Sequence, residues 1–158
     1  MYSTAQPRLR CSAFCADIIG AMNRKDLQAL ANLRMREARA LYKAGEFSGA
    51  YYLIGYAVEC GLKACIAKKF KRYDFPDKKG VNEAHTHNLK TLCVLAMLDG
   101  PRVQLEQADP LFERNWSLTI TWSEESRYKV FDKQKCQDLM DAIMERRHGV
   151  MPWIKQHW

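Results

Sequence analysis

Glycine and proline are scarce in this chain, with eight and five residues of 158, so low-complexity and collagen-like proteins are excluded. Long apolar runs are also missing. The longest uncharged apolar stretch, residues 47–58, ends at Glu59, whereas a membrane-spanning helix needs about 20 apolar residues. The sequence therefore predicts no membrane helix. The 47% apolar content instead predicts a single globular domain with its own core.

Familiar catalytic and metal-binding motifs are missing as well. None of the six cysteines forms a CxxC pair, and the chain contains no GxSxG, Walker A or HExxH motif. Cys60, Cys65 and Cys93 lie in strongly apolar stretches, which is typical of reduced, buried thiols in a cytoplasmic protein. His85 and His87 form an HxH pair, but no further ligand lies at a recognisable spacing. We therefore expect no metal, no cofactor and no catalytic residue.

The balance of charge is basic. The formal net charge is +7, which favours anionic partners such as nucleic acid or nucleotides. Basic residues are densest between positions 63 and 79. Within this stretch we expect nucleic-acid contacts from Lys68, Lys69, Lys71 and Arg72, in and just before a predicted loop at residues 71–84.

Apolar residues recur at helical spacing along most of the chain. Residues 1–21 lack this pattern and are interpreted as a weakly ordered extension of a domain at 22–158. The first helix is expected at residues 25–44, ended by Gly45. A second, apolar almost all round and therefore central, is expected at residues 49–70 with Ser48 as its cap. Because their connection is short, the two helices should form an antiparallel hairpin.

Further helices are expected at residues 87–98, ended by Asp99-Gly100-Pro101, then at 102–116 with a break near Asp109, and at 132–146. Residues 117–122 have strand propensity but no partner strand, so we expect coil. A last segment, 151–158, follows an interruption at Gly149. The prediction is an all-α antiparallel bundle of four to five main helices.

One face of the second predicted helix is polar or aromatic. Tyr52, Tyr56, Glu59 and Lys63 follow one another at helical spacing, and Glu59 and Lys63 have the favoured order for an ion pair. Two interpretations are open. Glu59 and Lys63 form a purely structural ion pair at the end of an apolar helix, or the four residues form a polar cluster that lines a cleft or a dimer interface.

Two later segments offer further candidates. His87 lies near the start of the third predicted helix. Arg127 and Tyr128 follow two acidic residues in a predicted loop, where an arginine can grip a phosphate or a carboxylate or can fasten the loop to the bundle.

Four segments resemble HEPN domains, the higher eukaryotes and prokaryotes nucleotide-binding family. They read REARAL at residues 36–41, EFSGAYYLIGYAVECGLKA at 46–64 and HNLKTL at 87–92, with Trp122, Arg127 and Tyr128 in a later loop. The resemblance covers residues 22–158. It implies a small helical bundle, a homodimer and association with nucleotide or RNA. Many members accompany a minimal nucleotidyltransferase in toxin–antitoxin pairs.

Many HEPN proteins are also metal-independent ribonucleases, with an arginine followed, after four to six residues, by a histidine. No arginine stands at that spacing before any of the four histidines here. We therefore expect a non-catalytic binding module, a dimer that binds nucleotide, RNA or a partner protein. Two alternatives stay open: a divergent ribonuclease that uses His87 or His148 with Arg127 or Arg147, and a purely structural partner of a nucleotidyltransferase.

Overall fold

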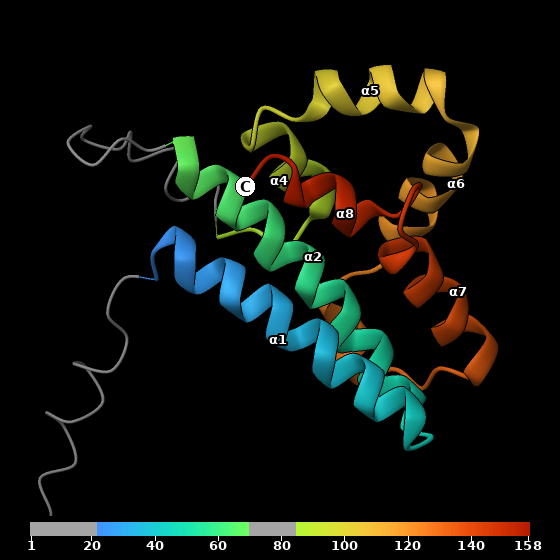
Figure 1. Cartoon of the computed structure of the whole chain (residues 1–158). Coiled ribbons are helices and arrows are strands. Elements are labelled where there is room, and N and C mark those ends of the chain that lie inside the picture. The colour runs from blue at the N-terminus through green and yellow to red at the C-terminus, as the bar shows by residue number, and fades with distance from the viewer. Residues whose placement is uncertain (1–21, 70–84) are drawn as a thin grey trace, which may run out of the picture.

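A computed structural model describes residues 22–69 and 85–158 as a bundle of seven α-helices and one short 3-10 helix, with no strand in those two stretches (Figure 1). The expected all-α class is confirmed. The helices outnumber the four to five main helices expected, because the region 102–116 forms two helices, separated at Asp109 as predicted, and the last segment, 151–158, contains a short helix of its own. The predicted extension at 1–21 and the whole of the predicted loop at 71–84 lie outside the described residues.

Helix α1 (Arg24–Lys43) begins at a capping box in which the Asn23 side chain accepts from the Asp26 backbone N–H and the Asp26 side chain accepts from that of Asn23. It ends before Gly45, whose φ of 85° lies in the left-handed region that glycine adopts without strain. The predicted boundaries were therefore accurate to about a residue.

Helix α2 (Phe47–Lys69) runs antiparallel beside α1, and the two form the predicted hairpin (Figure 1). Its buried residues cover most of its circumference, and α1, α4, α7 and α8 all pack against it, as expected of a central helix. The cap assignment was wrong. Ser48 lies inside the helix, and its Oγ accepts a hydrogen bond from the Phe131 backbone N–H at 2.9 Å, which joins α2 to the segment before α7.

The predicted helix at 87–98 is shorter in the structure. Helix α4 (Leu89–Leu95) begins after Asn88, whose side chain caps it, and ends in a turn at Met97 with φ 57°. Asp99-Gly100-Pro101 was expected to stop a helix, but it opens α5 (Asp99–Ala108). The first backbone N–H groups of a helix have no partner within it, so a proline there costs no hydrogen bond.

Helix α6 (Pro110–Thr119) extends further than the sequence suggested. Its last residues fall in the stretch 117–122 that was interpreted as coil. Thr119 is fully buried, and its hydroxyl donates to the Asn115 carbonyl at 2.7 Å. Burial in the bundle therefore outweighs the strand propensity of this stretch. The next segment, which was expected to be a loop, contains the 3-10 helix η1 (Glu124–Tyr128).

The C-terminal region holds α7 (Lys133–Met144), capped by the Asp132 side chain, and α8 (Val150–Lys155). The predicted helix at 132–146 ends two residues early, because the Glu145 carboxylate accepts the backbone N–H groups of Arg147 and His148 and closes a turn. Gly149 separates the two helices, as expected.

One core joins residues from α1, α2, α4, α6, α7 and α8. Cys60, Cys65, Cys93 and Cys136 are all buried and unpaired, which confirms the prediction of buried free thiols. Across 22–69 and 85–158, no helix combines the length and the apolarity that a bilayer crossing needs.

Candidate functional site

The polar cluster predicted on α2 is centred on Glu59, whose side chain is only 2% exposed. Lys63, one turn further on, donates from Nζ to Glu59 Oε1 at 2.8 Å. His87, immediately before the cap of α4, places Nδ1 2.9 Å from Oε1 and 3.0 Å from Oε2. A carboxylate this deeply buried needs such partners to offset its lost hydration. Through its contact with His87, Glu59 therefore links the start of α4 to α2 and holds the His87 ring in one orientation.

The tautomer of His87 follows from this contact. A carboxylate accepts hydrogen bonds, so Nδ1 carries the proton and Nε2 is left to accept from, or when protonated donate to, a further group. The side chain is 46% exposed. His87 lines a hollow of about 360 Å³ between the start of α4 and the segment before η1, together with Lys90, Trp122 and Ser123. The hollow thus contains a positioned imidazole, an ammonium and hydroxyl groups, and Glu124 adds one carboxylate to its lining.

Trp122 is one of the residues of this hollow, with Lys90 and Ser123, that sequence reasoning did not select as site residues. It is 3% exposed, and its indole Nε1 is buried without a hydrogen-bond partner in the described structure. A buried donor usually finds an acceptor, because leaving it unpaired costs about 1–3 kcal/mol. In the sequence it was marked only as part of the loop with Arg127 and Tyr128 that resembles HEPN domains.

The aromatic part of the predicted cluster surrounds the same indole. Tyr52 lies 6.0 Å from the Trp122 ring and 6.2 Å from the Tyr56 ring, centroid to centroid. Burial, followed by the nearby Cys60 and Glu59, raises the pKa of Tyr56 to about 12, so its hydroxyl stays protonated and available as a donor.

Arg127 and Tyr128 complete the predicted set, although no hydrogen bond or ion pair joins them to Glu59 or His87 in the part of the chain that the structure describes. The Arg127 guanidinium lies over the Tyr128 ring at 4.9 Å, and contact with Tyr128 and then Tyr52 raises the pKa of Arg127. Tyr128 is 72% exposed. The candidate site therefore has two halves, Glu59–Lys63–His87 and Tyr52–Arg127–Tyr128, which meet at Trp122.

Of the four predicted nucleic-acid contacts, the structure describes Lys68 and Lys69, both exposed in the last turn of α2. Lys68 Nζ donates to the His157 carbonyl at 3.1 Å, so its positive charge has a neutral partner. Positive charges near a helix C-terminus interact favourably with the helix dipole, so both lysines also stabilise the end of α2. Lys71 and Arg72 lie outside the described residues.

The HxH pair does not gather a metal site in the parts of the chain that the structure describes, where no group of three or more ligating side chains converges. Cys93, the nearest cysteine in the sequence, is fully buried, and burial raises the pKa of its thiol to about 12. A thiol held neutral in this way is a poor metal ligand.

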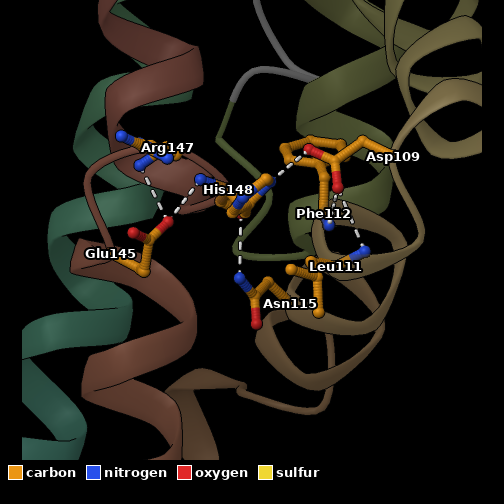
Figure 2. A network of polar contacts seen from close by, with 7 residues as sticks. All are labelled: Asp109, Leu111, Phe112, Asn115, Glu145, Arg147 and His148. Carbon is orange, nitrogen blue, oxygen red and sulfur yellow. Dashed lines mark hydrogen bonds and ion pairs between the residues drawn. The ribbon is translucent and has the colours of Figure 1, made fainter.

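A second polar network lies around His148, which the sequence offered only as an alternative catalytic residue (Figure 2). Its Nδ1 lies 2.6 Å from Asp109 Oδ2, and its carbonyl accepts from Asn115 Nδ2 at 2.9 Å. The contact with His148 lowers the pKa of Asp109, and the other oxygen of Asp109 caps α6. This network joins the start of α6 to the turn between α7 and α8.

The fold and the site define a helical bundle whose central helix carries a buried carboxylate bound to a histidine and a lysine. Comparisons of the chain with models of protein families, with curated proteins and with solved structures find no match. The family resemblance therefore stays a prediction that depends on the four quoted segments.

Proposed function

We propose that this chain is a HEPN-like binding module: a non-catalytic homodimer that associates with nucleotide or RNA. In the setting that the resemblance implies, its protein partner is a minimal nucleotidyltransferase in a toxin–antitoxin or defence system. The buried free thiols support a cytoplasmic location.

The observation that carries the nucleotide part of this proposal is the hollow beside His87. Its volume of about 360 Å³ lies in the range of small-ligand sites. His87 and Lys90 offer donors or cations to a phosphate, and they outnumber the single carboxylate of the lining, that of Glu124. The Glu59 carboxylate does not repel an anion strongly here, because Lys63 and His87 share its charge.

RNA association is assigned to the basic segment formed by Lys68, Lys69, Lys71 and Arg72. Such a segment suits phosphate contacts that are sensitive to salt and independent of sequence. Arg127, by contrast, is engaged with two tyrosines, and it suits a defined ligand or a dimer contact.

The dimer is proposed from the resemblance and from the exposed aromatic part of the site. The apolar character of α2 does not by itself require a second copy, since one chain already buries most of that helix. What it leaves accessible includes Tyr52 and Tyr56, with Tyr128 of η1 nearby in the same half of the site. Light scattering at micromolar protein should give twice 18.3 kDa, and a mass near 18.3 kDa would contradict the dimer.

The alternative, a divergent ribonuclease, needs a histidine beside a cation that clamps the same phosphate. His148 is bound to Asp109, and the hollow that it lines also contains Asp138, Asp141 and Glu145, with Arg114 as its one arginine. This acidic lining disfavours a phosphodiester. Incubation of the protein with total RNA in EDTA tests the point. Cleavage that His87→Ala or His148→Ala abolishes would make the chain an enzyme.

The proposal is tested by calorimetric titration with a nucleoside 5′-monophosphate. His87→Ala should weaken binding by about tenfold, because one charge-assisted hydrogen bond is removed. His85→Ala is the matched control: it removes an exposed imidazole two residues away that does not line the hollow. Equal losses in the two variants, or no binding by the unaltered protein, would refute the site.

A further inference from the structure

Three cations converge on a second hollow, between α1 and α8. It has a volume of about 350 Å³ and is lined by Arg36 and Arg39 of α1 and Lys155 of α8, with no acidic side chain among the residues that form it. Arg36 and Arg39 are three positions apart and therefore lie on one face of α1.

None of these three cations forms an ion pair within the described residues. The nearest acidic residues in sequence are engaged elsewhere: Glu37 pairs with Arg34, and Glu145 accepts backbone N–H groups of the turn after α7. Like charges that surround one hollow repel each other, and nothing in the described structure compensates them. Burial, and then the Arg39 guanidinium, lower the pKa of the Lys155 ammonium.

The Lys155 ammonium is held in position. It donates to Asn32 Oδ1, which also lines the hollow, at 2.7 Å, and it lies 5.4 Å from the centre of the Trp158 ring. Neither partner neutralises its charge. The fold therefore fixes an ammonium beside two guanidinium groups, on the rigid framework of α1 and α8.

The remaining wall of the hollow is soft and apolar. Pro152 and three methionines supply it: Met35 from α1, Met144 from the end of α7 and Met151 from α8. Met35 and Met151 are buried. Thioether side chains are polarisable and adapt their shape to flat or irregular organic groups. The hollow therefore combines a cationic rim with a surface for an uncharged organic group.

We propose that the α1–α8 hollow binds a small phosphomonoester, with the phosphate on Arg36, Arg39 and Lys155 and the organic group on the methionines. Guanidinium groups match the geometry of phosphate oxygens, and a dianionic monoester balances more of this charge than a phosphodiester does. The inference goes beyond the proposed function, since it concerns other helices than the His87 hollow and the basic segment.

The experiment is a calorimetric titration of the full chain with phenyl phosphate, inorganic phosphate and phenol at neutral pH. Phenyl phosphate should bind most tightly, because it alone satisfies both the rim and the methionines. The double variant Arg36→Gln/Arg39→Gln should bind it about 100-fold more weakly, or roughly tenfold for each charged contact. The control Lys25→Gln/Lys43→Gln removes the same charge from exposed positions of α1 outside the hollow and should bind as the unaltered protein does.

Four results would overturn the inference. They are no binding of phenyl phosphate at millimolar concentration, equal binding of phenyl and inorganic phosphate, tighter binding of phenol than of phenyl phosphate, and an equal loss in the control variant. None of the four substituted side chains belongs to the buried core, so the variants should fold, which circular dichroism checks. A nucleoside 5′-monophosphate is itself a phosphomonoester, so the variants distinguish the two hollows: His87→Ala should leave phenyl phosphate binding intact, and Arg36→Gln/Arg39→Gln should leave the effect of His87→Ala on nucleotide binding intact.

Discussion

Gly55 of α2 lies directly against the indole ring of Trp122. A Cβ placed on Gly55 would stand 2.3 Å from both Cδ1 and Cγ of that ring, far inside van der Waals contact. The absent side chain lets the segment before η1 approach the central helix. Because Trp122 also lines the hollow beside His87, the same contact positions one wall of the candidate site.

Gly55→Ala should therefore destabilise the protein. Overpacking against a rigid ring costs about 1–3 kcal/mol, which the better helix propensity of alanine, about 1 kcal/mol, offsets only in part. Gly100→Ala is the matched control, since Gly100 lies in α5 and a Cβ there meets no atom within 4 Å. Urea unfolding should show a loss for the first variant and no loss for the second. Equal effects would contradict the packing described for Trp122.

The long helices could be predicted from the sequence because their signals are local. Gly45 marks the end of α1 through its own backbone preference, and the apolar run of α2 identifies the central helix. The short elements could not, because tertiary contacts decide them. Ser48 looks like a cap in the sequence, yet its hydroxyl binds the backbone of Phe131, 83 residues away.

The candidate site was predictable only within one element. The spacing of Glu59 and Lys63 predicts their ion pair, which the structure confirms. The contact between Glu59 and His87 depends on how α4 packs on α2, which no local pattern encodes. The same holds for the hollow formed by Arg36, Arg39 and Lys155, because α1 and α8 stand at opposite ends of the described chain.

Glu59→Gln tests whether the contacts of the buried carboxylate stabilise the packing of α4 on α2. The amide removes the charge that both Lys63 and His87 contact, and its NH₂ group faces their donors, so we expect a loss of about 1–3 kcal/mol in the free energy of unfolding. Glu125→Gln, in η1 and outside the buried core, should change stability by less than about 0.5 kcal/mol. If chemical denaturation shows that Glu59→Gln changes the free energy of unfolding as little as Glu125→Gln does, the buried carboxylate does not stabilise the packing of α4 on α2.

The pair Asp109–His148 should give stability a dependence on acid pH. The contact with His148 lowers the pKa of Asp109 below 3.8, so its contribution to stability is present above that pH and is lost as the pH falls through the folded-state value. Asp109→Asn keeps a good helix cap but removes the charge. The stability advantage of the unaltered protein over this variant should shrink below about pH 4, as measured by urea midpoints from pH 7 to pH 3. An advantage that stays constant or grows as the pH falls would contradict the assignment.

The central claim, that this chain binds an anionic partner through its basic segment, is tested most directly by the salt dependence of single-stranded RNA binding, measured by fluorescence anisotropy. Replacing Lys68, Lys69, Lys71 and Arg72 by alanine should weaken binding and flatten the log–log salt slope by about 0.7 for each phosphate group that the variant no longer neutralises. A control with the same charge change replaces four exposed lysines elsewhere by alanine: Lys25, Lys43, Lys129 and Lys133. The account predicts that this control retains most of the slope. An unchanged slope in the basic-segment variant, together with abolished binding in Arg127→Ala, would contradict it.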